Sequence, residues 1–527
     1  MAKILVSDKL SKDGLDILEA SGMPVVMKTG MTEDELCREI ADYDALIIRS
    51  GTKVTRKVID AAKNLRVIGR AGVGVDNVDV PYATEKGILV MNTPTANILS
   101  AAEHTCGMIL AMARNIPAAH KSMHEGKWDR SKFTGVELNG KVLGIIGVGR
   151  VGGEVAKRLK PFNMTMIGYD PYLPKSVADD IGVRLTTLEE VLTTSDFMTI
   201  HTPLLPSTRN MIAMPQFKMM KPTARLANVA RGGIVNEDDL YTALKEHIIA
   251  GAAFDVWCSE PLDDNEKKLL ELDNLVTTPH LGASTVEAQE RVAVDIAHAA
   301  VSYLKDGIIT NAINAPRGKL TPETAPYVPL AENMGDLGRQ LCGSAPISTA
   351  EVVYYGGLSQ TDCKLITVSA VKGIIKGIVG SDGANIINAL PVAKSKGIEV
   401  KETKVDRTEN NYSNMIELRL TSGGNLTFIR GTVFGDEARL INYNGYRFNV
   451  PLSGNTVFVT YPDVKGVVAK IGAALAEAGI DIKEMAVSTK EGSSDALTVL
   501  VLGSAADAAT VEGIAKAVNG TAVAAGL

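Results

Sequence analysis

The sequence predicts an α/β protein with two doubly wound domains built on parallel sheets, followed by a further α/β domain and a C-terminal domain of ferredoxin-like order. Short apolar runs alternate with stretches of helical periodicity, which is typical of parallel sheets covered by helices. This alternation occurs in two separate series. The chain of 527 residues is also too long for one core, because domains usually hold about 100–200 residues.

The first series contains four expected strands, at residues 4–8, 45–50, 66–72 and 88–94. The second contains six, at residues 142–149, 164–171, 197–203, 225–233, 250–257 and 275–280. Apolar residues at helical spacing predict two long connecting helices, over 97–114 and 288–304. We expect the second helix to carry the chain back to the first domain. Residues 1–95 and 283–310 then form one domain and residues 96–282 another, with a cleft between them.

A proline-rich stretch at residues 314–329 indicates the next boundary, because repeated Pro interrupts helices and removes backbone donors. Residues 317–452 are expected to form the third domain. Residues 453–527 show the order strand, helix, strand, strand, helix, strand, which predicts a ferredoxin-like module.

Composition excludes several classes of function. A net charge of −6 without a basic cluster argues against nucleic acid as a partner. Five single cysteines without a CxxC pair argue against a disulfide framework and a metal site, and favour a reducing cytoplasm. The N-terminus lacks the pattern of a signal peptide, and no stretch reaches the roughly 18 apolar residues of a membrane helix. We therefore expect a cytoplasmic protein without a membrane partner.

The motif GVGRVG lies directly after an apolar strand and before a helical stretch. In this context Gly147 permits a tight turn, Gly149 permits close approach to a pyrophosphate, and Gly152 permits close helix–strand packing. Asp170 ends the next strand, 23 residues after Gly147, where a carboxylate binds ribose hydroxyls and repels a 2′-phosphate. The sequence therefore predicts a Rossmann-like domain that binds NAD rather than NADP. The alternative is a structural glycine turn with a surface Asp.

Three residues near expected strand ends match the oxidation of a secondary alcohol. His280 can exchange the hydroxyl proton near neutral pH. Glu260, in the tripeptide SEP, can orient its ring and raise its pKa. Arg231 offers a planar fork of donors to a carboxylate. A single His at a strand end is more often structural. His104, in a helix, is interpreted as packing between helices, and His201 as a neighbour of the cofactor.

NVARGGIVNEDDL, FDVWCSEP and PHLGAST resemble the signature stretches of the D-isomer-specific 2-hydroxyacid dehydrogenases. The resemblance implies catalytic roles for Arg231, Glu260 and His280. It also implies cofactor contacts at a further set of positions, namely Arg150, Val151, Asp170, Thr202, Val229, Asp255 and Gly282.

The N-terminal stretches IIRSGT and GRAGVGVDNVD resemble those with which the phosphoglycerate dehydrogenases of this family hold a carboxylate and a phosphate. Arg49, Ser50 and Arg70 are therefore expected to bind substrate. By the same resemblance, Arg130 and Lys132 reach the active site of a neighbouring subunit, and a homo-oligomer, with a tetramer favoured, is expected. The implied reaction is NAD-dependent oxidation of 3-phospho-D-glycerate to 3-phosphohydroxypyruvate, the first step of L-serine biosynthesis. Val73 replaces a polar residue of several relatives, which removes one hydrogen bond to the cofactor.

Residues 317–452 and 453–527 resemble the intervening (allosteric substrate-binding-like) domain and the ACT domain of the long-form members. ACT modules of this kind bind an amino-acid effector, here expected at Tyr461, Asp463 and Asp481. Lys465 stands where Pro is usual, and Asp481 where Asn is usual. Because Asp repels a carboxylate that Asn would bind, we predict that L-serine feedback is weakened, absent or altered while the module still pairs subunits.

Three other functions stay open at this point. One is a different D-2-hydroxyacid dehydrogenase, such as a glyoxylate or 2-oxoglutarate reductase, although such short relatives end near residue 320. The second is a non-catalytic NAD-sensing regulator. The third is an amino-acid-binding module attached to a vestigial enzyme. Turnover of NADH separates the first from the other two.

Overall fold

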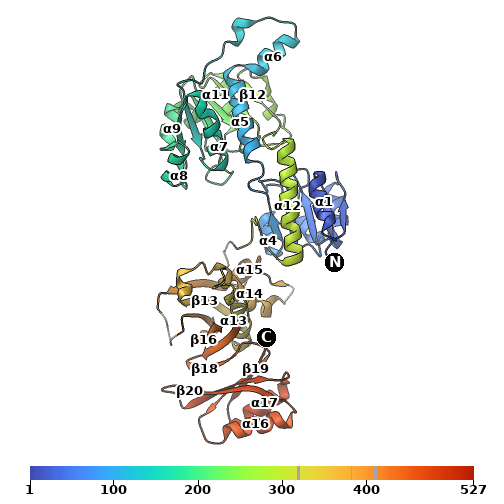
Figure 1. The fold of residues 1–527 in the computed structure, drawn as a ribbon, viewed down its shortest axis with the longest axis vertical. Helices are drawn as coiled ribbons and strands as arrows, with labels where there is room; N and C mark the ends of the chain where they lie inside the picture. The colour runs from blue at the N-terminus through green and yellow to red at the C-terminus, as the bar shows by residue number, and fades with distance from the viewer. Residues whose placement is uncertain (317–320, 381–382, 408–411) are drawn as a thin grey trace.

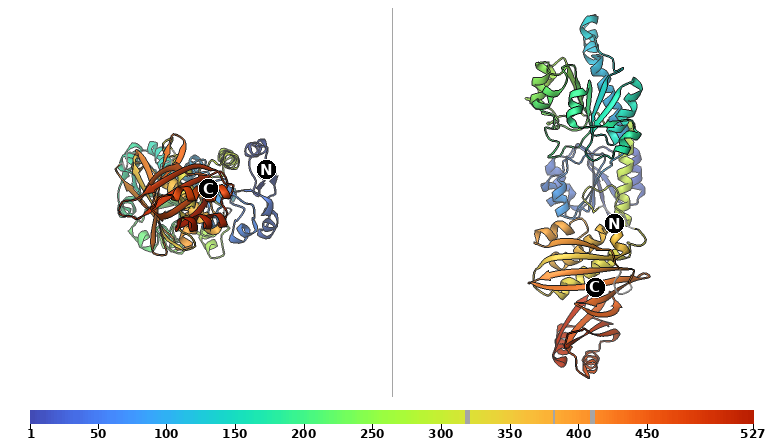
Figure 2. Two further views of the ribbon diagram at one scale, coloured as in Figure 1. Left: turned by 90° about the horizontal axis from the view of Figure 1, so that it is seen from below. Right: turned by 90° about the vertical axis from the view of Figure 1, so that its left-hand side faces the viewer.

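The structure is a computed structural model that describes residues 1–316, 321–380, 383–407 and 412–527. The molecule is elongated, and four sheet-based units follow one another along its long axis (Figures 1 and 2). This four-part α/β architecture confirms the predicted fold class. The domain limits stay a prediction, and the first residues expected in the third domain, 317–320, lie outside the described residues.

The first sheet is parallel, with the order β2-β1-β3-β4-β5. Its strands are β1 (Ile4–Val6), β2 (Val25–Met27), β3 (Ala45–Ile48), β4 (Val67–Arg70) and β5 (Leu89–Met91). β2 is an edge strand that the sequence pattern does not predict; Val25 and Val26 are partly buried and Met27 is exposed. The short helices of this unit are α1 (Lys12–Ala20), α2 (Glu33–Glu39), α3 (Arg56–Ala61) and α4 (Val80–Glu85).

The long helix α12 (Val286–Asp306) returns the chain to this first sheet, as expected. It packs against α1 and buries Ile296 and Ala297 in the same core as Ile4 and Val6. Gly14 of α1 lies so close to α12 that an added Cβ would stand 2.7 Å from the Cβ of Ala293. The two helices therefore pack tightly over one face of the sheet.

The second sheet is also parallel, with the order β12-β11-β10-β9-β6-β7-β8. Its strands are β6 (Val142–Ile146), β7 (Thr165–Tyr169), β8 (Arg184–Leu185), β9 (Phe197–Ile200), β10 (Arg225–Asn228), β11 (Gly251–Phe254) and β12 (Leu275–Thr277). β8 adds a seventh strand to the six expected, and its two residues are too few to produce a periodic signal. The strand order reverses at β6, which lies between β7 and β9. Ligands of doubly wound sheets bind beyond the strand ends at such a point.

Helices cover both faces of the second sheet. α5 (Ile98–Ala113) and α7 (Arg150–Leu159) share one core with β6, and α9 (Leu188–Thr194), α10 (Met214–Met219) and α11 (Glu237–Lys245) share the other. α8 (Lys175–Asp180) lies near the β8 edge. α6 (Ile116–His124) projects away from the sheet at the end of the molecule (Figure 1).

The third sheet is mixed, with the order β14-β13-β15-β16-β17-β18, and only its β13/β14 pair is parallel. Its strands are β13 (Ile347–Gly356), β14 (Glu399–Val405), β15 (Asn414–Ser422), β16 (Asn425–Phe434), β17 (Glu437–Tyr443) and β18 (Tyr446–Pro451). Its helices are α13 (Tyr327–Leu341), α14 (Lys364–Val379) and α15 (Ala389–Ser395). α15 follows Asn385, whose side chain donates to the carbonyl of Gly87 in the first unit at 2.9 Å.

The C-terminal sheet is antiparallel, with the order β20-β21-β19-β22. Its elements are β19 (Asn455–Pro462), α16 (Val467–Glu477), β20 (Ile482–Thr489), β21 (Asp495–Leu502), α17 (Ala508–Val518) and β22 (Thr521–Gly526), in the expected ferredoxin-like order. β20 contacts β18, and an Arg439–Glu484 ion pair of 3.3 Å joins the two sheets. Within the described residues, no helix combines the length and apolar character needed to cross a lipid bilayer.

Candidate active site

His280 lies just beyond β12 and contacts Glu260 directly. Its Nδ1 lies 2.7 Å from Glu260 Oε2. Its backbone is in the left-handed region at φ 56°, and its N–H donates to the carbonyl of Asp255, the residue after β11, at 2.7 Å. The ring remains 45% exposed. Glu260 and His280, twenty positions apart in the sequence, are therefore in direct contact, and the second ring nitrogen is left for another partner.

Glu260 is held from the other side by its own turn. The N–H of Trp257 donates to Glu260 Oε1 at 3.1 Å, and the indole Nε1 of Trp257 donates to the carbonyl of Thr278 at 3.3 Å. Burial by itself would raise the pKa of Glu260, but hydrogen bonding to His280, the charge on that ring and the Trp257 N–H together lower it. The carboxylate therefore stays ionised beside the imidazole.

His201 also lies near this site but has different properties. Its Nε2 lies 2.9 Å from Thr199 Oγ1, and burial lowers its pKa to about 3. An imidazole that stays neutral cannot exchange a proton near neutral pH. The buried His201 is therefore unsuited to proton exchange, whereas the partly exposed His280 beside Glu260 is suited to it.

Arg231 follows β10 and faces the first sheet. Its Nε donates to Asp76 Oδ2 at 3.2 Å, and its Nη1 to the carbonyl of Ala230 at 2.7 Å. Arg70, at the end of β4, lies nearby. Burial and the charge of Arg231 lower its pKa to about 10, and its buried Nε has no described partner. Two guanidinium groups from different sheets therefore meet at the boundary between the units.

Two cavities are lined by both His280 and Arg231. The first, of about 480 Å³, is lined by the expected cofactor residues Arg150, Val151, Thr202, Val229, Asp255 and Gly282 together with Arg231 and His280. The second, of about 660 Å³, is lined by the expected substrate residues Arg49, Ser50 and Arg70, and also by Lys53, Arg231, Glu260 and His280. Arg231 and His280 line both. The structure thus brings these predicted residues together around one connected region.

The glycine turn has the geometry that close approach of a ligand requires. Gly147 has φ 89°, and an added Cβ there would stand 2.8 Å from the carbonyl oxygen of His201. An added Cβ at Gly152 would stand 2.2 Å from the carbonyl oxygen of Gly147, whereas one at Gly149 would meet nothing within 4 Å. Gly149 is the N-cap residue of α7, so its open side faces the space beyond a helix N-terminus.

The two expected cofactor carboxylates already accept hydrogen bonds from the protein. Asp170 Oδ2 accepts from Val148 N at 3.1 Å, and its Oδ1 accepts from the N–H groups of Tyr172 and Leu173. Asp255 is fully buried and accepts from Leu281 N at 2.7 Å and Gly282 N at 2.8 Å. Asp255 therefore supports the backbone that carries His280, and the predicted cofactor contact of its carboxylate stays a prediction.

The interpretation of His104 as packing between helices is wrong. Its Nε2 lies 3.2 Å from Asp255 Oδ1 and 3.1 Å from Thr278 Oγ1, so α5 is bonded to the chain around His280. The sequence pattern predicts neither Lys53 nor Asp76 as the partner of Arg231. The Asp76–Arg231 contact has no local signal, because it spans 155 positions.

Some predicted residues lie outside this site. Arg130 and Lys132 belong to an exposed turn that follows α6, and neither lines the two cavities. In the C-terminal unit, Tyr461 is 3% exposed and its hydroxyl lies 2.7 Å from Thr498 Oγ1, so its side chain packs inside rather than facing an effector. Asp463 and Asp481 are exposed, and Asp481 pairs with Lys483 at 2.8 Å.

Comparison with known families agrees with this arrangement. Residues 106–282 match the NAD-binding domain of the D-isomer-specific 2-hydroxyacid dehydrogenases. Residues 323–444 match the D-3-phosphoglycerate dehydrogenase intervening domain, and residues 455–520 match the ACT domain. The chain is thus an NAD-dependent oxidoreductase of the D-2-hydroxyacid class that carries an ACT domain.

Similar proteins narrow this class. A D-3-phosphoglycerate dehydrogenase of Archaeoglobus fulgidus is 40% identical over 95% of this chain and 94% of its own length. One of Methanocaldococcus jannaschii is 42% identical over 95% of both chains. The solved NAD-dependent formate dehydrogenase of Staphylococcus aureus, in complex with NAD, superimposes on 60% of this chain and all of its own with a TM-score of 0.55 and 31% identity. The chain belongs to the D-3-phosphoglycerate dehydrogenase family.

Proposed function

We propose that this protein oxidises 3-phospho-D-glycerate to 3-phosphohydroxypyruvate with NAD. The observation that carries the proposal is the His280–Glu260 contact at the junction of two cavities, with Arg231 in the walls of both. A proton acceptor, the acid that orients it and a cation for the carboxylate thus meet where a hydroxy acid and a dinucleotide can lie side by side.

In this proposal His280 is the general acid and base. Glu260 accepts the hydrogen bond from Nδ1–H, which leaves the lone pair of Nε2 free to take the proton of the substrate hydroxyl. The ionised Glu260 stabilises the imidazolium that results. In the reverse direction the same Nε2 returns the proton. Arg231 holds the carboxylate beside the reacting carbon.

The cavity beside His280 suits a substrate with two anionic groups. Arg49, Lys53, Arg70 and Arg231 line its walls. A carboxylate occupies one planar guanidinium fork, and the remaining cations are left for a phosphate. Glyoxylate, with a single carboxylate, leaves them unpaired. 2-Oxoglutarate offers a second carboxylate with one negative charge, whereas a phosphate carries up to two, so the number of cations favours the phosphorylated substrate over both.

The residues around the glycine turn fit NAD. Thr202 lines the first cavity, and its buried Oγ1 has no hydrogen-bond partner among the described residues. Such a hydroxyl is available to hydrogen-bond a ligand in that cavity. The open side of Gly149 admits a pyrophosphate at the N-terminus of α7. When bound, NAD supplies the nicotinamide C4 that takes the hydride. Asp170, Arg150 and Gly282 would hold the remainder of the dinucleotide.

We also place this protein in a homo-oligomer, with a tetramer favoured, in the cytoplasm. Trp128 is 75% exposed in the turn next to Arg130, which supports burial of that turn by a second subunit. Arg130 and Lys132 would then approach the active site of that subunit. The ACT domain would bind an amino acid near Asp463 and Asp481, with serine feedback weakened, absent or altered.

NADH-linked turnover tests the substrate. With purified full-length protein, we expect the 3-phosphohydroxypyruvate rate at limiting substrate to exceed the 2-oxoglutarate and glyoxylate rates by at least about tenfold. Faster turnover of either unphosphorylated acid would overturn the substrate assignment. Binding of NADH without turnover of any of the three would indicate a non-catalytic sensor instead.

A further inference from the structure

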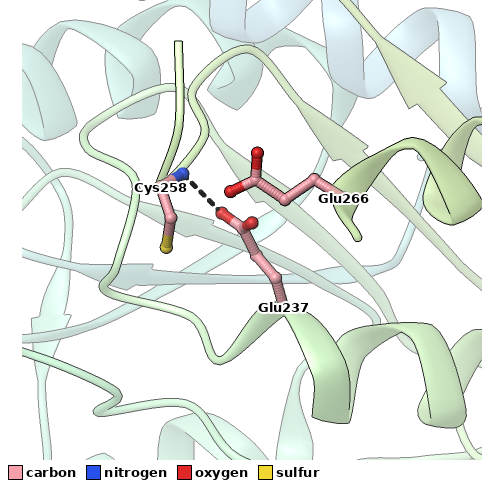
Figure 3. A group of neighbouring side chains, drawn as sticks. All are labelled: Glu237, Cys258 and Glu266. Carbon is pink, nitrogen blue, oxygen red and sulfur yellow. Dashed lines mark hydrogen bonds between the residues drawn. The ribbon is translucent and has the colours of Figure 1, made fainter. Parts of the chain in front are cut away.

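The turn that carries Glu260 is held by two other carboxyl groups, Glu237 at the start of α11 and Glu266 in the 3₁₀ helix η4 (Glu266–Glu271) (Figure 3). Cys258 N donates to Glu237 Oε1 at 2.8 Å, and Ser259 N donates to Glu266 Oε1 at 2.8 Å. Glu266 Oε2 also accepts from Asp263 N at 3.0 Å. The two backbone N–H groups directly before Glu260 are thus each bound by a different acid.

The second oxygen of Glu237 distinguishes this arrangement from an ordinary turn. Glu237 Oε2 is buried and accepts from no N–H or O–H group of the described residues, and the thiol of Cys258 lies beside the carboxyl. The carboxyl of Glu266 lies beside it, since ligand atoms of Glu237, Cys258 and Glu266 all lie within 4.8 Å of one another (Figure 3). Two ionised carboxylates repel at such a separation, whereas a protonated carboxyl donates a hydrogen bond to an ionised one.

Burial and the neighbouring Glu266 raise the pKa of Glu237 to about 7, even though hydrogen bonding from the N–H and the thiol of Cys258 acts to lower it. The surrounding charged and titratable groups are Glu266 and Lys268 of η4, Cys258 and Asp238. The carboxylate of Asp238 is paired with Lys268 at 2.6 Å. No described cation neutralises Glu237 itself, so a shared proton is the remaining way to satisfy the pair.

We propose that Glu237 and Glu266 are positioning residues for the reaction: Glu237 donates a proton to Glu266, and together they fix the turn from which Glu260 reaches His280. Neither residue touches the substrate, because both act through the backbone of Cys258 and Ser259. The inference rests on the proposed role of Glu260. Neither acid is predicted from the sequence to be a site residue.

A metal ion is the competing occupant of the cluster, since three possible ligands converge there. The contacts favour the proton. Both oxygens of Glu266 already accept backbone N–H groups.

Glu237→Gln and Glu237→Ala test the proposal, with Glu246→Gln, at the exposed C-cap of the same helix, as the matched control. In Gln the amide oxygen still accepts from Cys258 N and the NH₂ permanently replaces the shared proton. We expect kcat of Glu237→Gln within about twofold of wild type at pH 6, and kcat of Glu237→Ala lowered about tenfold with KM for NAD unchanged. Glu246→Gln should match wild type throughout.

The pH dependence separates a shared proton from mere packing. The folded pKa of Glu237 lies above its usual 4.5, so its stabilising contact is present at low pH and is lost as the pH rises through about 7. The thermal midpoint of wild type should therefore fall more between pH 6 and 8.5 than that of Glu237→Gln. This readout does not depend on catalysis, so it can fail separately from the proposed function.

Equal pH dependence of the wild-type and Glu237→Gln midpoints, or a tenfold lower kcat in Glu237→Gln, would overturn the proposal. A metal arm completes the test. Treatment of the wild-type protein with EDTA should leave the rate unchanged. If EDTA instead lowers the activity, and added Zn²⁺ restores the activity of wild type but not that of Glu237→Ala, the cluster binds a metal.

Discussion

Arg231 and Asp76 form an ion pair across the boundary between the first and second units, with Nε and Oδ2 at 3.2 Å. Asp76 is 73% exposed and Arg231 30%. The guanidinium that we assign to the substrate carboxylate is therefore partly occupied by a carboxylate of the protein itself. A bound substrate would compete with Asp76 for the same donor.

Asp76→Asn should lower KM for the hydroxy acid. An exposed pair is worth at most about 1 kcal/mol, so the decrease should not exceed about fivefold, and kcat should change little. Initial rates over a range of substrate concentrations measure it. Asp264→Asn, which removes a similarly exposed carboxylate paired with Lys267, is the control. An increase in KM would instead show that Asp76 orients Arg231 productively.

His280→Ala should lower kcat by about 10²–10⁴-fold, the usual contribution of general acid–base catalysis. Glu260→Gln should have a smaller effect, about 10–100-fold, because the ring keeps an acceptor at Nδ1 but loses the charge that stabilises its protonated form. Stopped-flow measurement of NADH formation checks both. NADH affinity should stay near wild type, and His298→Ala, an exposed histidine on α12, should be fully active. Wild-type rates in His280→Ala would refute the mechanism.

Gly149→Ala and Gly147→Ala should separate cofactor binding from folding. A Cβ at Gly149 meets no protein atom within 4 Å, so Ala should raise the Kd for NADH at least about tenfold with little change in thermal midpoint. Gly147 has φ 89°, and an added Cβ there would lie against the His201 carbonyl. Gly147→Ala should therefore destabilise the fold by about 1–2 kcal/mol or more. Fluorescence titration and thermal unfolding measure the two effects. Equal NADH affinity of Gly149→Ala and wild type would contradict the assignment.

Asp255→Asn should destabilise the second unit by about 2–3 kcal/mol, because an amide cannot accept from the Leu281 and Gly282 N–H groups with both of its atoms. Burial acts to raise the pKa of Asp255, but its hydrogen bonds to His104, Thr278, Leu281 and Gly282 outweigh burial and lower it.

The stabilisation by Asp255 is therefore complete above the unfolded pKa of about 3.9 and is lost as the pH falls through the lower folded value. The difference in stability between wild type and Asp255→Asn should be constant from pH 5 to 8 and should shrink in more acidic buffer. Trp257 fluorescence, in a Trp128→Phe background, follows the transition in a chain with two tryptophans. A difference that grew on acidification would contradict the cited hydrogen bonds.

L-Serine at millimolar concentration should inhibit the wild-type enzyme less than about twofold, because Asp481 repels the carboxylate of an amino acid. Asp481→Asn should tighten serine binding by about fivefold, the size of one removed exposed charge contact. Calorimetric titration and inhibition curves measure the two quantities. Glu491→Gln, at another exposed acid of the same domain, should have no effect. Strong inhibition of wild type would refute the prediction.

Much of the fold can be predicted from local patterns. Apolar runs and helical periodicity predict β1, β3 to β7 and β9 to β12, and miss β2 and β8. The glycine spacing predicts the turn at Gly147, because positive φ and close approach are requirements of the backbone itself. The residue types at 231, 260 and 280 indicate the chemistry, because proton exchange and carboxylate binding need particular functional groups.

The partners of those groups depend on the tertiary structure. Arg231 meets Asp76, His104 meets Asp255, and Glu237 meets Glu266 because separate elements pack together, and no short-range periodicity reports such contacts. Tyr461 likewise lies only two positions before the exposed Asp463, but its side chain packs into the core from β19, whereas Asp463 lies beyond the end of that strand. The sequence by itself determined which chemical groups and which backbone turns this protein has. Packing between distant segments decided which of those groups face one another, because contact energy and desolvation arise only once the chain is folded.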